Sequence, residues 1–162
     1  MGTHQVVGGI VSPVHDAYGK RGLVAQTHRL AMVKIALQTS SWIRLSDWEC
    51  QQEEWTRTKN TLQYHQNYLN SFIKNLNGMA TGNLPGWLPE NAKKIKDPVQ
   101  IKLLCGADLL ESFATPGLWE PEDVSHFLFI NRLLNSYNSL FPAGSNIRTT
   151  WNCCNISKWI KS

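Results

Sequence analysis

The strongest indication of the fold class is the segment Gln-Val-Val-Gly-Gly-Ile-Val-Ser-Pro-Val-His-Asp-Ala-Tyr-Gly-Lys-Arg-Gly, residues 5–22. Its first part, Gln5 to Val11, is a continuous apolar and β-branched run that stops at Ser12-Pro13, a pattern typical of a buried parallel strand. The second part, Val14 to Gly22, holds glycines and charged residues, as does a loop at the carboxyl end of such a strand. This order predicts the start of an α/β unit.

The next segments predict a helix, a strand and a second helix. Thr27 is a suitable cap for a helix that reaches about Thr39, with an apolar face. Trp42 to Trp48 has the composition of a second strand. Apolar residues at spacings of three, four and seven then predict a long helix from about Gln51 to Leu76.

The alternation continues after a loop. Asn77 to Pro98 carries three prolines, three glycines and a lysine cluster, and is predicted to be a surface loop or linker. Val99 to Cys105 is predicted to be a third strand, followed by a short helix through Phe113. Strands alternating with helices favour a parallel sheet with right-handed crossovers, so we expect an α/β fold.

Composition limits the classes of protein and of partner. The chain has 162 residues, of which 42% are hydrophobic and 17% charged, as in a globular domain. Its net charge of +4 suits phosphate-bearing small molecules but is too weak and scattered to predict nucleic-acid binding. No apolar run approaches the ~20 residues of a membrane helix, so no membrane partner is expected. The four cysteines have no zinc or redox spacing, and an intracellular compartment is expected.

The character of the sequence changes after residue 124. No aspartate or glutamate follows Asp123, while asparagine occurs six times in the last 38 residues. Phe127 to Leu134 is apolar enough for a helix or a strand, but the rest shows no period. We therefore expect residues 5–124 to form the domain and residues 125–162 to form a divergent tail.

Two polar positions follow predicted strands, where ligands of parallel sheets bind. Lys20 and Arg21 lie between two glycines, so the backbone and both cations could meet a phosphate, although spacing alone favours a solvated pair on a flexible turn. Gly106 and Asp108 begin the helix after the third strand. They could receive a ribose, or Asp108 could cap the helix.

Aromatic residues and histidines give weaker signals. Trp55 and Trp119 could stack on a planar ligand ring, but tryptophans at such positions also serve as core. His15 and His28 have no partner at metal-ligand spacing, and no Ser/His/Asp set is evident. We therefore name no catalytic residue and no metal site.

Longer stretches carry a resemblance to one enzyme family. Gly-Gly-Ile-Val-Ser-Pro-Val-His-Asp-Ala-Tyr-Gly-Lys at 8–20 and Leu-Leu-Cys-Gly-Ala-Asp-Leu-Leu-Glu-Ser-Phe at 103–113 resemble the animal nicotinamide mononucleotide (NMN) adenylyltransferases, the insect members most closely. The resemblance covers about residues 5 to 124. It also includes several shorter motifs: His-Arg-Leu-Ala-Met at 28–32, Ser-Trp-Ile-Arg at 41–44, Trp48-Glu49, Trp55-x-x-Thr58 and Pro-Gly-Leu-Trp at 116–119.

The resemblance implies a Rossmann-like sheet of the nucleotidylyltransferase type and a nucleotidyltransferase activity. NMN and ATP would be the substrates, NAD and pyrophosphate the products, with Mg²⁺ as the ion. The NMN phosphate would attack the α-phosphorus of ATP in line. Such a reaction needs positioning and charge stabilisation more than an acid or a base, which agrees with the lack of a candidate base.

The resemblance also implies which residues bind the mononucleotide. Lys20 would reach the NMN phosphate, and Trp55 and Trp119 would stack on the nicotinamide ring. Thr58 and the backbone at Leu118 would fix the carboxamide. Gly106 and Asp108 would receive the nucleotide ribose.

Two family motifs are not found in the chain. They are a Gly-x-Phe-x-Pro loop with a His-x-x-His pair, which grips the ATP phosphates, and a late Ile-Ser-Ser-Thr-x-x-Arg segment. We therefore expect an incomplete fold without its first strand and C-terminal part, with strand edges left unpaired and little NAD formation by this chain. The alternative is a catalytically inactive truncated isoform that binds nucleotide, or docks on full-length subunits. Assembly into homo-oligomers and a nuclear or cytoplasmic location are further expectations from the family.

Overall fold

The computed structural model describes residues 5–75, 84–130 and 154–161. The chain forms two compact units. Unit 1 consists of residues 1–104 together with 153–162, and unit 2 consists of residues 105–152. Each unit is described separately below.

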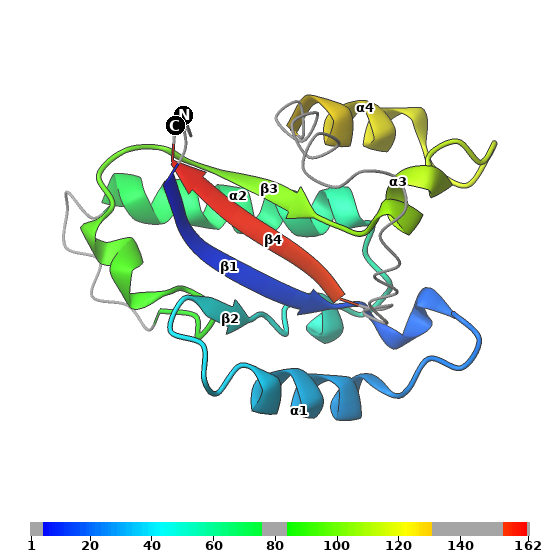
Figure 1. Ribbon diagram of the computed structural model, residues 1–162, viewed down its shortest axis with the longest axis horizontal. Coiled ribbons are helices and arrows are strands. Elements are labelled where there is room, and N and C mark those ends of the chain that lie inside the picture. The colour runs from blue at the N-terminus through cyan, green and yellow to red at the C-terminus, as the bar shows by residue number, and fades with distance from the viewer. Residues whose placement is uncertain (1–4, 76–83, 131–153, 162) are drawn as a thin grey trace. The chain divides into compact units, whose positions relative to one another are not determined.

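A four-stranded sheet with the order β2-β1-β4-β3 forms the centre of unit 1 (Figure 1). β1 (Gln5–Pro13) pairs in parallel with β2 (Ile43–Leu45). On its other side β1 pairs antiparallel with β4 (Cys154–Lys161), which in turn pairs antiparallel with β3 (Val99–Leu104). β1, β2 and β3 therefore run in one direction and β4 runs against them.

The predicted first strand is confirmed, and it is central because its residues are apolar on both faces. β1 is buried from Gly8 onward, and Ile10 is fully buried. Gly9 allows β2 to approach, since a Cβ there would lie 3.2 Å from the Trp42 ring and 3.3 Å from Ile43.

The expected parallel sheet is confirmed in part, because β1 and β2 pair in parallel, but the expectation that strand edges are left unpaired beside β1 and β3 is wrong. β4 fills the space between β1 and β3, and its Ser157 pairs with both Ile10 and Leu103. The facing edges of two strands need backbone partners, and an antiparallel strand satisfies them as well as a parallel one does. Residues 154–161, which belong to the predicted tail, are thus part of the sheet of unit 1.

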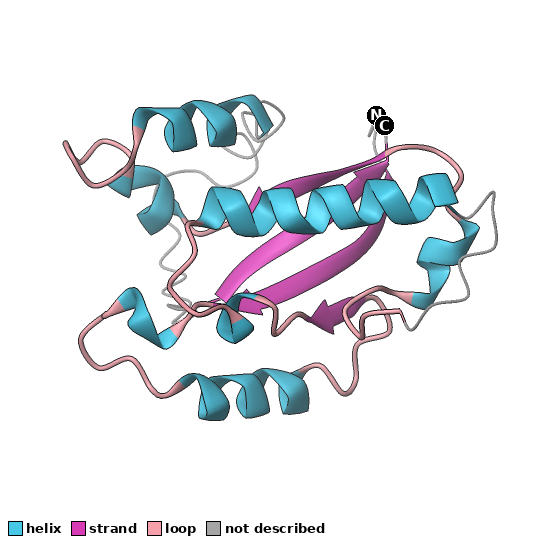
Figure 2. Ribbon diagram, turned by 180° about the vertical axis from the view of Figure 1, so that it is seen from behind, coloured by secondary structure: helices cyan, strands magenta, loops and turns pink. Residues whose placement is uncertain are grey.

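Helix α2 (Thr58–Asn75) lies across one face of the sheet (Figure 2). Its buried stripe includes Leu62, Leu69 and Ile73, which recur at the helical spacing. The helix begins later than predicted, at Thr58 rather than near Gln51. The chain first makes a short 3-10 turn, η2 (Glu49–Gln51), in which Glu49 and Cys50 are buried.

A side chain of α2 also covers the outer edge of β3. The Gln66 amide donates from Nε2 to the carbonyl of Val99 at 2.7 Å, and its Oε1 accepts from the Ile101 N–H at 2.7 Å. Exposed strand edges invite pairing with other chains, so this amide protects part of β3.

Helix α1 (Gln26–Ala36) buries only Arg29 and Val33. The prediction that Thr27 caps this helix is wrong, because the N-cap residue is Ala25 and no side chain caps the N-terminus. The lysine-rich loop contains a 3-10 turn, η3 (Glu90–Lys94), just before β3.

In unit 2 the described residues form two short helices, α3 (Ala107–Ser112) and α4 (Pro121–Ile130). The helix predicted after the third strand is confirmed and ends one residue earlier than predicted. The apolar run from Phe127 to Leu134 begins in α4, and residues 131–134 lie outside the described part. None of the described helices is both long and apolar enough to cross a membrane.

Candidate functional site

The loop that carries Lys20 follows β1 directly. It begins with a 3-10 turn, η1 (Asp16–Tyr18), in which the His15 Nδ1 accepts from the backbone N–H of Ala17 at 3.1 Å. The turn ends at Gly19, whose φ of 70° is in the left-handed region. Gly22 has a φ of 77°, so two glycines bracket the exposed Lys20 and Arg21 in the way that the sequence predicted.

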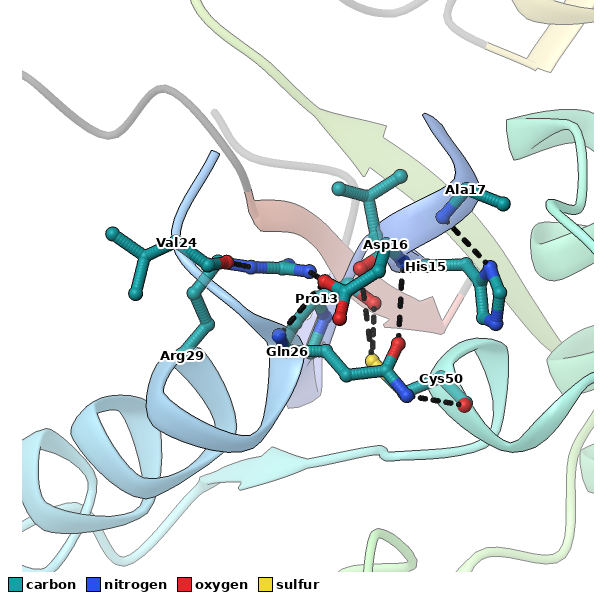
Figure 3. A network of polar contacts seen from close by, with 9 residues as sticks. Pro13, His15, Asp16, Ala17, Val24, Gln26, Arg29 and Cys50 are labelled. Carbon is teal, nitrogen blue, oxygen red and sulfur yellow. Dashed lines mark hydrogen bonds and ion pairs between the residues drawn. The ribbon is translucent and has the colours of Figure 1, made fainter. Parts of the chain in front are cut away.

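A network of polar contacts holds this loop on the start of α1 (Figure 3). The Asp16 Oδ1 accepts from the backbone N–H of Gln26 at 2.7 Å and from the Arg29 Nη2 at 2.8 Å. These two donors, the backbone N–H first and the guanidinium second, lower the pKa of Asp16. In return, the Gln26 Oε1 accepts from the backbone N–H of Asp16 at 3.2 Å.

The same network reaches η2. Gln26 donates from Nε2 to the carbonyl of Cys50 at 3.0 Å, and the Cys50 thiol donates to the carbonyl of Pro13 at 3.2 Å (Figure 3). Burial raises the pKa of Cys50 to about 11, so this thiol stays protonated at neutral pH and can keep donating. The end of β1, α1 and η2 are therefore tied to one another.

A second set of contacts, the buried polar chain, runs behind the loop and consists of Ser12, Glu49, Thr61, His65 and Ser46. Each of these residues is at most 2% exposed. The Glu49 Oε2 accepts from the Ser12 hydroxyl at 3.1 Å and from the Thr61 hydroxyl at 3.3 Å. The backbone N–H of His15 donates to the same carboxyl, so Glu49 joins the end of β1 to α2.

His65 continues the chain toward β2. Its Nδ1 lies 2.7 Å from the backbone carbonyl of Thr61, and its Nε2 lies 2.8 Å from the Ser46 hydroxyl. A carbonyl can only accept, so Nδ1 carries the hydrogen, and in the neutral ring Nε2 accepts from Ser46. The ring packs edge-on against Trp87, with centroids 4.8 Å apart.

Burial shifts both titratable groups of the buried polar chain toward their neutral forms. It raises the pKa of Glu49 to about 7, although the Ser12 and Thr61 hydroxyls favour the carboxylate. It lowers the pKa of His65 to about 4, although the Thr61 carbonyl favours the protonated ring. Of the two titratable residues in the buried polar chain, Glu49 is therefore the one that changes charge near neutral pH.

Trp55 lies between η2 and α2, opposite the loop. This residue is 42% exposed, which excludes the alternative that it is a core residue. It contacts Tyr18, with ring centroids 5.8 Å apart and planes tilted by 38°. Thr58, three residues later, is the first residue of α2. The loop that carries Lys20 therefore touches the segment that carries Trp55 and Thr58.

Gly106 and Asp108 lie in unit 2, at the start of α3. Gly106 is the N-cap residue and no side chain caps the helix, so the interpretation of Asp108 as the cap is wrong. The carboxylate of Asp108 instead lies over Gly106, because a Cβ at 106 would be 2.5 Å from Asp108 Oδ1. Both residues are exposed. Burial, and to a smaller extent the Asp108 charge, raises the pKa of Cys105 to about 11.

Trp119 is held by rings and by one hydrogen bond within unit 2. Its ring meets Phe113 edge-on at 5.0 Å and Phe127 edge-on at 5.8 Å. Its Nε1 donates to the Ser112 hydroxyl at 3.0 Å. Leu118, before it, is 60% exposed and follows Gly117, whose φ is 74°. Trp119 is thus partly buried, with a fixed ring orientation.

The predicted site residues divide between the units. Lys20, Trp55 and Thr58 lie in unit 1, on segments in contact with each other, and Gly106, Asp108, Leu118 and Trp119 lie in unit 2. Whether the two sets share one cavity stays a prediction. In the part of the chain that the structure describes, no group of three or more His, Cys, Asp or Glu could hold a metal ion.

Sequence reasoning missed Glu49, Gln26 and Arg29 as residues that shape the loop. Glu49 and Arg29 each lie inside a quoted motif, but a charged residue in a motif gives no sign that it is buried. Their partners are up to 37 residues away along the chain, beyond the reach of any local pattern.

Comparison with known proteins identifies relatives along the whole chain. A nicotinamide-nucleotide adenylyltransferase of Drosophila melanogaster is 49% identical over 170 residues, which cover 98% of this chain and 44% of that protein. A nicotinamide/nicotinic acid mononucleotide adenylyltransferase 1 of Bos taurus is 37% identical, over 78% of this chain and 50% of that protein. The corresponding adenylyltransferase 2 of Mus musculus is 34% identical, over 74% and 57%.

The chain therefore spans about half the length of the relatives it matches. The match with the Drosophila protein extends into residues 125–162, since it covers 98% of the chain. No model of a known protein family matches the chain.

Proposed function

The chain belongs to the nicotinamide mononucleotide adenylyltransferase family, as a partial match to longer relatives, and we propose that it carries the pyridine-mononucleotide part of the active site. The protein to which it belongs would join NMN to the AMP part of ATP, forming NAD and releasing pyrophosphate. On this proposal the chain serves NAD biosynthesis as a nucleotidyltransferase.

The contact between the Lys20 loop and the Trp55 segment supports the proposal most directly. A mononucleotide has an anionic phosphate at one end and a planar ring at the other, so its site needs a cation and an aromatic face within one molecule's length. The loop offers the exposed Lys20 two residues after Tyr18, and Tyr18 contacts the exposed ring of Trp55. Lys20 would neutralise the phosphate, and Trp55 would stack on the pyridine ring.

Unit 2 would supply the rest of the mononucleotide contacts. The Asp108 carboxylate lies over Gly106 and can accept from ribose hydroxyls, so these two residues would receive the sugar. Trp119 would stack on the second face of the pyridine ring, while Thr58 and the backbone at Leu118 would fix its carboxamide.

The transfer itself would depend on alignment more than on acid or base chemistry. The mononucleotide phosphate must lie in line with the α-phosphorus of ATP, and held reactants gain rate through positioning. The ATP phosphates would bring Mg²⁺, which usually binds through substrate phosphates and few protein ligands. The proposal also takes the sheet to be of the nucleotidylyltransferase type, and includes assembly of several copies and a nuclear or cytoplasmic location.

An activity assay tests the proposal. The purified chain is incubated with NMN, ATP and Mg²⁺ beside a longer relative, and NAD is measured, while NMN binding is followed by calorimetry. We expect NMN binding but little or no NAD, because the two family motifs that bind the ATP phosphates are not found in this chain. Loss of even one preorganised donor to such a phosphate raises the activation free energy by about 3–4 kcal/mol. Absence of NMN binding would contradict the proposed site, and turnover equal to that of the relative would contradict the expected loss of ATP binding.

A further inference from the structure

Glu49 is a buried acid that the proposed reaction does not use. It is 1% exposed and lies in η2, between β1 and α2. Buried carboxyls are costly unless they are hydrogen-bonded, and this one has donors on two elements: the Ser12 hydroxyl and the His15 N–H at the end of β1, and the Thr61 hydroxyl of α2. Because Glu49 is buried, it does not serve to make the protein surface soluble, and its position needs another explanation.

The two elements that Glu49 joins are those that carry the mononucleotide residues of unit 1. The His15 N–H begins the loop that leads to Lys20. Thr61 lies one turn after Thr58, and Trp55 lies between Glu49 and that helix. Since the loop and the segment meet at the Tyr18–Trp55 contact, a shift of the carboxyl would change the spacing between cation and ring.

We propose that Glu49 is a positioning residue for pyridine-mononucleotide binding, which sets the distance between the Lys20 loop and the Trp55 segment through its bonds to Ser12, His15 and Thr61. This inference rests on the proposed function. In this inference Glu49 touches no substrate and acts only through the loop that carries Lys20 and through α2.

The ionisation of Glu49 gives the inference a readout. Its pKa of about 7 lies within reach of an ordinary titration, and a carboxylate there would add a negative charge behind a site for an anionic phosphate. NMN affinity should therefore fall as the pH rises through about 7. Next to Glu49 and its neighbour Cys50 lie His15, Asp16, Arg29 and Asp47, and His65 follows beyond Thr61.

The experiment is a calorimetric titration of the whole chain with NMN between about pH 5.5 and pH 8.5, in the unaltered protein, Glu49→Gln and Glu53→Gln. Glu53 is an exposed acid four residues further on, so it is the matched control. The NMN phosphate itself gains charge near pH 6, but it does so equally in all three proteins.

In the unaltered chain and in Glu53→Gln, we expect an affinity loss of roughly fivefold across pH 7, as for one charge that faces a phosphate at moderate screening. In Glu49→Gln, which keeps an acceptor but cannot ionise, this loss should disappear. Equal pH profiles in all three proteins would overturn the inference and leave the proposed function standing. Failure of the unaltered chain to bind NMN would overturn both.

A second variant covers the case in which Glu49→Gln does not fold. Thr61→Val removes one hydroxyl that favours the carboxylate, so the loss of affinity should move to higher pH. Circular dichroism confirms that the variant is folded. An unmoved inflection in folded Thr61→Val would overturn the inference, because a purely structural role would change affinity at every pH alike.

Discussion

The two units hold their predicted binding residues by different means. In unit 1 the Lys20 loop is fastened by two hydrogen-bonded networks to β1, α1, η2 and α2, and a four-stranded sheet lies behind it. In unit 2, helix α3 has no buried residue, and Trp119 is held by two phenylalanine rings and Ser112. Bonds between residues far apart in the sequence fix the first set, whereas contacts with residues less than ten positions away fix Trp119 in the second.

The two units are therefore sensitive to different substitutions. A loop pinned by buried polar groups fails when any partner loses its bond, because each orphaned group then pays its full desolvation cost. Exposed residues on short helices tolerate change, since water satisfies what a lost contact leaves behind. Substitutions in unit 1 should therefore cost more than comparable substitutions in unit 2.

The largest expected effect comes from the strand that completes the sheet. Ser157→Pro removes a backbone donor from β4, which pairs on both sides, and proline is not tolerated in central strands. We expect unit 1 to lose its cooperative unfolding transition in urea. Ser157→Ala keeps the backbone donor and should unfold at the same urea concentration as the unaltered chain. A proline variant as stable as this control would show that β4 does not hold the sheet.

The next effect concerns the pH dependence of stability in unit 1. The pKa of Glu49 is raised from 4.5 to about 7, so the folded state binds the extra proton and stability falls as the pH rises through this window. The pKa of His65 is lowered from 6.5 to about 4, so stability falls as the pH drops through that window. Each contribution is on the order of 3 kcal/mol at its limit, and the two oppose each other between pH 4.5 and 6.5.

Urea unfolding of single variants separates these contributions. The unaltered chain should show a nearly flat free energy of unfolding between pH 4.5 and 6.5. In Glu49→Gln only the contribution of His65 is left, so the free energy of unfolding should rise with pH in this range. In His65→Gln only the contribution of Glu49 is left, so the free energy of unfolding should fall. Parallel profiles in the two variants would contradict the assignment of neutral forms to the buried polar chain.

The smallest expected effect is the difference in unfolding free energy between alanine substitutions at one glycine of each unit. Gly19 and Gly117 have φ values of 70° and 74°, which cost an alanine about 1–2 kcal/mol. Gly19→Ala should cost the full amount, because the network around Asp16 prevents the loop from relaxing, and Gly117→Ala should cost less. Gly86→Ala is the neutral control, since a Cβ there meets nothing within 4 Å. If urea unfolding showed that Gly19→Ala and Gly117→Ala lose the same free energy of unfolding, the two units would not differ in how firmly they hold these turns.

Local sequence patterns were sufficient for the elements whose signals are local. The apolar run of β1, the glycine loop after it, β3 and α3 were all predicted within about two residues, because burial on both faces and glycine conformations leave clear marks. The family resemblance, not these patterns, assigned chemical roles to Lys20, Trp55 and Trp119.

Long-range features were not predictable in this way. β4 has no alternating pattern and gains its structure from pairing with β1 and β3, which both lie far from it along the chain. The start of α2 was misplaced because helical spacing continues back through Trp55, although the burial of Glu49 requires a turn there. The buried polar chain depends on contacts between residues 12, 49 and 61, which no single window contains.

The most direct test of the central claim, that unit 1 presents a pyridine-mononucleotide surface at Trp55, is NMN binding by two tryptophan variants. Trp55 and Trp42 are 42% and 46% exposed and lie in the same unit, so Trp42→Ala is a matched control. Calorimetry should show that Trp55→Ala loses about 1–3 kcal/mol of NMN binding free energy, the value of one stacked ring, while Trp42→Ala binds as the unaltered chain does. Equal NMN affinity in the unaltered chain and in Trp55→Ala would contradict the account.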